Sequence, residues 1–402
     1  MTPHSPTSKR FVIILGLLAG LVAFAIDISL PAIPSMVYAL ATSMSSGQQV
    51  VGLFMAGMAV GQIPFGLLSD RIGRLPILYA GIGLFTVAGI VTSISNTIEI
   101  MLVARFIQGL GSSAGMVLAR AIVRDISSGV ESARLLSIMV MIFTAAPMIA
   151  PMFGSLLTMA YGWRAPFAAT AAAGLLILYG IRSSLSETHT PHAQPQILRQ
   201  LVESLQQFLS HRQSVFGLLI ITVNMIGIMS IVSGSVALIV ELYGYPIKYF
   251  GLIFATVGIA ILFGSTINRR LLEHLDTMQV IGIGVFLAII ASGQLLFMVW
   301  QNDANFWWLW GNVCLFMAAT SFMLPNATAL ALDPVPEIAG VAASIIGTVQ
   351  SLAGAASAII SSALYNGTYI NVAVIVAGSG IFALIIFSLR GAILDNKPAI
   401  NP

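Results

Sequence analysis

The chain has 402 residues, of which 58% are hydrophobic and 8% are charged, and its formal net charge is +3. A soluble protein carries about 25% charged residues, so this composition excludes an ordinary soluble domain and predicts a membrane protein. The small positive charge is not gathered into a basic patch, which excludes a nucleic-acid-binding surface.

Twelve apolar runs are long enough to cross a bilayer, which takes about 20 mostly apolar residues. Lys9 and Arg10 precede the first run as in a signal peptide, but no small-residue cleavage site follows, so we interpret it as the first span. The expected spans are residues 11–34, 48–68, 75–94, 98–119, 134–159, 164–182, 214–240, 248–268, 277–300, 305–330, 338–363 and 369–390.

The least apolar break in the chain, residues 183–213, divides the spans into two sets of six. From Gln196 onward the break has the apolar period of an amphipathic helix. The sequence therefore predicts an all-α polytopic membrane protein with two pseudo-symmetric six-helix bundles, residues 1–182 and 214–402, joined by a cytoplasmic linker.

The basic residues give the expected orientation of the chain. With the N-terminus inside, 14 Lys and Arg residues fall in or beside inner loops, and only Arg164 and Lys248 fall in outer loops. Because positive charge concentrates in cytoplasmic loops, we expect both termini in the cytoplasm, and the bacterial inner membrane as the location. The five tryptophans fall at the outer ends of spans, where aromatic belts lie.

A short repeat relates the two halves. Four residues separate Gly66 from Arg71 at the end of the second span, and the same spacing recurs between Gly264 and Arg269, 198 positions later, at the end of the eighth. Two halves related by duplication are typical of transporters whose binding site lies between them.

The loop after the second span reads GLLSDRIGRLP, residues 66–76. Gly66 allows two helices to approach closely, and Gly73 permits a tight turn. Asp70 stands at a helix end, where it can cap the helix or pair with a neighbouring one. An ordinary charged loop is the alternative interpretation.

This loop resembles the signature of the major facilitator superfamily, G-x-L-[AS]-D-R-x-G-R-[KR]-[PR]. In that family the loop gates the inner face, and the resemblance assigns a charge relay to Asp70, Arg71 and Arg74. The chain departs from the pattern at Leu75, where the family usually has a second basic residue.

The fourth span contains LVARFIQGLGSSAG, residues 102–115, with Arg105 as the basic residue well inside a span. Gln108 lies three positions on, which places it on the same helix face. The segment resembles the family motif R-x-x-Q-G-x-[GA], whose arginine is associated with proton coupling. A snorkelling arginine near the interface is the alternative.

The fifth span, TAAPMIAPMFGSLL, resembles the antiporter signature G-x-x-x-G-P-x-x-G-G. Ala146, Ala150, Pro151 and Gly154 stand at its positions, followed by Ser155, so three glycines are replaced by other small residues. Close packing and a proline kink are therefore expected to persist. A kinked helix with small faces and no link to export is the alternative.

The first span ends in AIDISLPAIP, with Asp27 inside the apolar run. The segment looks like the D-x-Y-L-P-A-x-P signature of the bicyclomycin and chloramphenicol resistance (Bcr/CflA) branch of drug:proton antiporters, with Ser29 where tyrosine is common. Residues 339–350, AGVAASIIGTVQ, resemble the A-G-T-A-S pattern of the same branch.

Asp27 and Arg105 are expected at similar depth in the outer halves of their helices, where together they could form a pair that faces the central cavity. Burial favours the protonated carboxyl and a nearby arginine favours the ionised one, so such a site can take up and release a proton. A purely structural role for Asp27, as a partner of Arg105 or a helix-breaking residue, is the alternative.

The resemblance implies a proton-coupled antiporter that exports small, fairly hydrophobic drugs by alternating access, as a monomer in the lipid bilayer. Export of one endogenous metabolite, such as a siderophore, sugar or amino acid, is the second hypothesis. No Gly-Lys dipeptide occurs, which excludes a P-loop pump, and no residue spacing predicts an enzyme, a metal site or a cofactor. Cys314 is the single cysteine.

Overall fold

The structure is a computed structural model that describes residues 9–127, 129–189, 197–301 and 305–394. Residues 190–196 of the expected linker, and the ends on which the positions of both termini were predicted, lie outside the described residues. The described chain is helical throughout its regular elements. They are α1 (Lys9–Asp27), η1 (Leu30–Ala32), α2 (Ile33–Ala39), α3 (Met44–Ile72), α4 (Arg74–Ile94), α5 (Ile98–Ile126), α6 (Gly129–Tyr161), α7 (Arg164–Ser184), α8 (Ile197–Ser210), α9 (Arg212–Val236), η2 (Ala237–Leu242), α10 (Ile247–Leu271), α11 (Thr277–Gln301), α12 (Phe306–Leu332), η3 (Pro336–Ile338), α13 (Ala339–Ala363), α14 (Ile370–Ser388) and α15 (Arg390–Leu394).

Twelve helical segments within the described residues are long and apolar enough to cross a membrane, which confirms the expected number. Their bounds agree with the expected spans to within a few residues at most ends. The loops at one end of the helices carry most of the arginines, and we call this the basic end. The opposite end carries Trp163, Trp300, Trp307 and Trp308, and we call it the tryptophan end.

The first span differs from its expected form. Residues 11–34 were predicted as one helix, but α1 ends at Asp27, and η1 and α2 follow after a break. Pro31 has no N–H to donate to the carbonyl four residues earlier, which is that of Asp27, and its ring crowds that carbonyl. The break therefore follows from the position of the proline.

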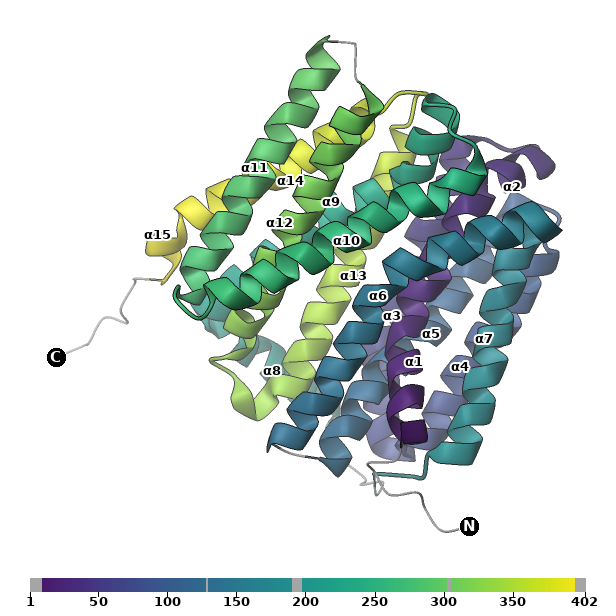
Figure 1. Cartoon of the computed structure of the whole chain (residues 1–402). Coiled ribbons are helices and arrows are strands. Elements are labelled where there is room, and N and C mark those ends of the chain that lie inside the picture. The colour runs from purple at the N-terminus through teal and green to yellow at the C-terminus, as the bar shows by residue number, and fades with distance from the viewer. Residues whose placement is uncertain (1–8, 128, 190–196, 302–304, 395–402) are drawn as a thin grey trace.

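The helices form two six-helix bundles that meet along two seams (Figure 1). One seam joins α3 to α13, and the other joins α6 to α10. Within the first bundle, α3 and α5 approach so closely that a Cβ added at Gly57 or Gly109 would overlap the facing backbone. Small residues at such crossings are the usual means of packing helices in lipid, where no hydrophobic effect drives the helices together.

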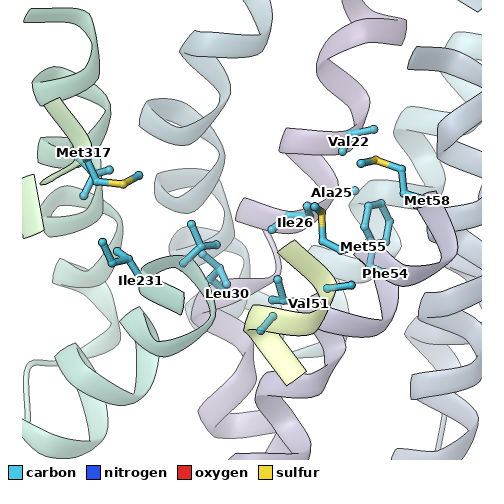
Figure 2. Packing of buried hydrophobic residues seen from close by; sticks show 14 of the residues in the cluster. Val22, Ala25, Ile26, Leu30, Val51, Phe54, Met55, Met58, Ile231 and Met317 are labelled. Atoms are coloured by element: carbon cyan, nitrogen blue, oxygen red, sulfur yellow. The ribbon is translucent and has the colours of Figure 1, made fainter. Parts of the chain in front are cut away.

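Buried apolar side chains continue across the junction of the bundles (Figure 2). Leu30, in the break of the first span, lies between Ile26 and Val51 on one side and Ile231 of the second bundle on the other. The amphipathic helix predicted from Gln196 is present as α8, which packs against α9 and α13.

Candidate transport site

The break in the first span also leaves the Ala25 carbonyl without its helical partner. The N–H of Ser29 donates to the Ile26 carbonyl at 3.2 Å rather than to the Ala25 carbonyl, which would be its partner in a continuous helix. The Ser29 hydroxyl also donates to Ile26, at 2.7 Å. A buried carbonyl left in this way needs a donor from elsewhere.

Arg105 of α5 supplies that donor. Its Nη1 and Nη2 both donate to the Ala25 carbonyl at 3.3 Å, and its Nε donates to the Val50 carbonyl of α3, also at 3.3 Å. The side chain is fully buried, and its guanidinium lies over the rings of Phe54, at 4.5 Å, and Phe167, at 5.7 Å. Carbonyl dipoles and aromatic faces therefore surround the guanidinium, and this excludes a snorkelling arginine.

Gln108 extends this network to a fourth helix. Its Oε1 accepts from Arg105 Nη1 at 2.9 Å, which confirms that the two residues share one helix face. Its Nε2 donates to the Thr170 hydroxyl of α7 at 2.8 Å. The polar centre of the first bundle thus ties α1, α3, α5 and α7 together through hydrogen bonds that all involve Arg105 or Gln108.

Asp27 is buried, with 5% of its surface exposed, and its side chain has no hydrogen bond or ion pair among the described residues. The ion pairs found among the described residues join Arg74 to Asp70 and Asp125 and Arg199 to Glu203, and none joins Asp27 to Arg105. The expected pair is therefore absent from this structure, because carbonyls rather than a carboxylate occupy the donors of Arg105. Asp27 remains a buried acid without a charged partner among the described residues.

The antiporter-motif helix packs on the break beside Asp27. A Cβ at Gly154 of α6 would overlap the Ile28 carbonyl and would lie 2.8 Å from the Pro31 ring, so only glycine fits there. Pro151 lies inside α6, as expected for a kink, and Ala150 is buried while Ala146 is partly buried. Of the residues predicted from the motif, Gly154 thus holds α6 against the broken first span.

At the basic end, Arg74 joins the ends of α3 and α5. Its guanidinium pairs with Asp70, donates to Asp125 from Nε at 2.9 Å, and donates to the Ser69 hydroxyl at 2.8 Å. Arg74 is buried, whereas Arg71 is exposed. Of the predicted charge relay, the structure therefore brings together Asp70 and Arg74, and it adds Asp125.

Glu187, which sequence analysis missed, completes this cluster from the segment after α7. Its carboxylate accepts from the backbone N–H groups of Arg74 at 2.8 Å and Leu75 at 3.0 Å, and so caps the first turn of α4. Gly73, the residue before α4, has a φ of 109°, and a Cβ there would lie 2.8 Å from the Glu187 carboxylate. Gly66 is less closely packed than Gly73, because a Cβ added there would lie at an ordinary contact distance of 3.5 Å from the Val117 side chain.

Among the described residues, no three His, Cys, Asp or Glu side chains gather in a way that would hold a metal ion. The one cysteine, Cys314, is free. The arrangement offers proton binding at a buried carboxyl, a buried guanidinium fixed by carbonyls, and a charge cluster at one end of the bundle.

The family description "Major Facilitator Superfamily" matches residues 15–358. The chain is 27% identical to the "Bicyclomycin resistance protein homolog" of Haemophilus influenzae, with 86% of this chain and 87% of that protein covered. It is 31% identical to the "Uncharacterized MFS-type transporter YdgK" of Bacillus subtilis, over 87% of this chain and 89% of that protein. Among solved structures, it matches a D-xylose-proton symporter with a TM-score of 0.74 at 17% identity, over 94% of this chain and 97% of that one.

These relatives are transporters rather than enzymes, and the match covers both bundles. The twelve spans and the signature loop of residues 66–76 agree with it. The chain therefore belongs to the major facilitator superfamily, and its relatives agree with the bicyclomycin and chloramphenicol resistance (Bcr/CflA) branch that its first span resembles.

Proposed function

We propose that the chain is a proton-coupled antiporter that exports small, fairly hydrophobic drugs by alternating access. The observation that carries the proposal is Asp27, a buried carboxyl without a partner inside a membrane-spanning segment. An ionisable group in such a place is costly and is typically found on an ion or substrate path. We infer that Asp27 binds the proton in one state and loses it in the other, while a substrate competes for the carboxylate.

The position of Asp27 supports this role. The turn η1 that follows it lies against α6 of its own bundle and against α9 and α10 of the other. A group beside the junction of two bundles changes its surroundings when the bundles rock, which is the requirement for coupling. Hydrogen bonds keep this part of the first bundle rigid, through Arg105, Gln108 and the neighbouring carbonyls. The change of surroundings on rocking therefore affects mainly Asp27.

We further propose that the basic end is cytoplasmic, with both termini inside, and that a monomer is sufficient because both bundles are in one chain. Of the contacts between α6 and α10 that involve glycine, the one at Gly251 lies toward the tryptophan end and the one at Gly258 near the middle of α10. The two helices diverge toward their basic ends (Figure 1). An exporter takes its substrate from the cytoplasm, and we infer that the α6–α10 seam parts at the basic end to admit it.

The names of the relatives support the substrate class. One is called a bicyclomycin resistance protein homolog, and another, the Escherichia coli "Multidrug resistance protein D", is 25% identical over 88% of this chain and 89% of that protein. Both names describe resistance to drugs. A narrower exporter of a single metabolite would share the fold and the proton site, and the two differ in whether unrelated compounds compete.

The test is efflux from cells or inverted vesicles that contain the chain, with chloramphenicol-like and bicyclomycin-like drugs, lipophilic cations and siderophores, each with and without an uncoupler. Export of several unrelated drugs that stops with the uncoupler is expected. Export of one compound alone would instead establish the metabolite exporter.

The decisive variant is Asp27→Asn, with Asp276→Asn as the matched control because Asp276 is an exposed acid between α10 and α11. Asp27→Asn is expected to abolish proton-driven efflux while leaving exchange of labelled for unlabelled substrate intact. Unchanged proton-driven efflux at normal expression would remove Asp27 from the mechanism.

A further inference from the structure

The seam between α3 and α13 has hydrogen bonds near the tryptophan end and at Gln62, with close apolar packing between them. The two helices run antiparallel. Near the tryptophan end, the Ser45 hydroxyl donates to the Ser362 carbonyl at 2.6 Å. Further in, Gly52 lies against Ile359 and Ala358: a Cβ added at the glycine would lie 2.7 Å from Ile359 Cγ1 and 3.4 Å from the Ala358 Cβ.

Gln62 makes the deepest of these contacts. Its Nε2 donates to the Gly347 carbonyl at 3.0 Å and to the Ser351 hydroxyl at 2.7 Å, and the side chain is 3% exposed. The Ser351 hydroxyl in turn donates to the Gly347 carbonyl at 2.8 Å. A Cβ at Gly347 would overlap Gln62 Oε1, so the glycine makes room for the amide.

The other seam has a different character. Between α6 and α10, the Ser155 hydroxyl accepts a hydrogen bond from the Gly251 N–H at 3.2 Å. The next glycine contact, between Gly258 and Met148, is apolar. Gly251 lies toward the tryptophan end of α10 and Gly258 near its middle, so these close contacts occupy the tryptophan half of the seam.

The Gln62 contact lies well away from both ends of α3 and α13, and this position determines how far it moves when the bundles rock. Ser351 is the central residue of α13, and Gln62 is about 15 Å from the basic end of α3 and about 27 Å from its other end, at 1.5 Å per residue. When two rigid bundles rock, contacts at either end must open in turn, while a contact near the axis moves little. A long amide that reaches two acceptors one turn apart tolerates a small change of angle without losing both bonds.

We propose that Gln62, with Gly347 and Ser351, is the pivot on which the two bundles rock, and that this contact persists while the contacts toward the tryptophan end break. Gln62 is thus a positioning residue, which fixes the register of α3 on α13 in both states. The proposal rests on the alternating-access cycle proposed above and goes beyond it by naming a contact that does not alternate.

Paired cysteines test the proposal in a Cys314→Ser background, which removes the single natural cysteine. One pair is Gly52→Cys with Ala358→Cys, close enough for a disulfide. The second pair is Gln62→Cys with Gly347→Cys, joined by a short bifunctional thiol reagent. Each pair is assayed for uncoupler-sensitive efflux before cross-linking, after cross-linking, and after reduction.

The disulfide at Gly52 and Ala358 is expected to lower efflux more than tenfold, with recovery on reduction. The cross-link at Gln62 and Gly347 is expected to leave at least half of the efflux of the same variant before cross-linking. Arrest by both cross-links would overturn the pivot, because the second contact would then have to open as well.

A second series tests the amide without cross-linking. Gln62→Leu keeps the volume but loses both bonds, and a roughly three- to tenfold fall in turnover with KM unchanged within about twofold is expected, as for loss of interhelical hydrogen bonds in lipid. Ser351→Thr keeps the hydroxyl and is expected to transport normally, unlike Ser351→Ala. A Gln62→Leu protein with unchanged turnover would contradict the proposal.

Failure of the antiporter proposal gives a different result from failure of the pivot proposal. If the wild-type chain gives no uncoupler-sensitive flux of any compound, the antiporter proposal fails before any variant is compared. The pivot is then tested by labelling a cysteine at Gly52, in the Cys314→Ser background, from the tryptophan side. Cross-linking at Gln62 and Gly347 should leave its rate of labelling unchanged, and a fall in that rate would refute the pivot.

Discussion

The basic ends of α3 and α10 are joined to neighbouring helices by different chemistry. In the first bundle, Arg74 pairs with Asp70 and Asp125 and so links α3, α4 and α5 by charge. In the second bundle, Asn326 of α12 donates to Asn268 of α10 at 2.7 Å. Asn268 follows Asp70 by the same 198 positions that separate Gly264 from Gly66.

The same contrast recurs inside the membrane. The first bundle buries Asp27 and Arg105, whereas the second buries amides and hydroxyls, such as Asn224, Asn312 and Asn371. Steps that depend on charge, including proton binding, are therefore expected in the first bundle. The second bundle is expected to contribute buried polar groups that are uncharged. Removing a buried charged side chain from the first bundle and a buried amide side chain from the second, and comparing the losses of stability, tests this division.

The largest effect is expected for Arg105→Leu. The variant leaves the Ala25 carbonyl and Gln108 Oε1 without donors, and each buried unsatisfied group costs about 1–3 kcal/mol, so the free energy of unfolding should fall by about 3 kcal/mol. Arg105→Lys should recover part of this loss. Unfolding in mixed micelles gives the free energies.

The matched variant in the second bundle is Asn312→Leu. Asn312 donates to Trp308 of its own helix at 3.0 Å and to the Met298 sulfur at 3.9 Å, so its loss should cost less than about 1 kcal/mol. Equal costs for the two variants would mean that burying charge in the first bundle has no special structural role.

A smaller effect is expected at the neutral junction of α10 and α12. Asn326→Leu leaves the Asn268 amide oxygen unpaired and should lower the free energy of unfolding by about 1–2 kcal/mol. The double variant, Asn268→Leu with Asn326→Leu, removes both partners and should recover most of the loss. A strictly additive double variant would show that the amide pair is not a unit.

The cap on α4 comes next in size. Glu187→Gln keeps one acceptor oxygen but loses the charge beside the first turn of the helix, so the free energy of unfolding should fall by about 1 kcal/mol, and less in high salt. Glu203→Gln on α8, which breaks an exposed pair with Arg199, is the control and should change little. A loss that does not depend on salt would point to packing rather than to charge.

Much of this fold could be predicted because each span must bury its own backbone hydrogen bonds in lipid, and apolar runs of the right length reveal that directly. The sharing of one face by Arg105 and Gln108 follows from helix period alone and is confirmed. The partners of Arg105 could not be predicted in the same way, because the rotation of α5 against α1 depends on packing.

Two features had signals in the sequence that were not used. Pro31 lies four residues after Asp27, which predicts the loss of a helical hydrogen bond there and hence the break that frees a carbonyl for Arg105. Glu187 is an acid in the polar break beside a basic loop. Its contact with α4 depends on the path of the chain after α7, which no local pattern specifies.

The smallest predicted effect concerns the tryptophan end of the second bundle, where the Glu241 carboxylate accepts a hydrogen bond from a tyrosine. Tyr365 donates to Glu241 Oε2 at 2.9 Å, and burial, the hydrogen bond and the carboxylate charge together raise the pKa of Tyr365 above its ordinary value of 10.0. A raised pKa means that folding favours the protonated phenol. Its contribution to stability is therefore complete below pH 10.0 and is lost as the pH rises through the raised pKa.

Titration of tyrosinate absorbance, as the difference between wild type and Tyr365→Phe, measures this shift. The tyrosine should ionise above its ordinary range, and Glu241→Gln should lower its pKa only in part, because burial is the largest cause. If Glu241→Gln restored the ordinary value, charge would outweigh burial at this site. The second bundle would then use charge at its tryptophan end as the first bundle does at its basic end, and the division between them would hold only for the membrane interior.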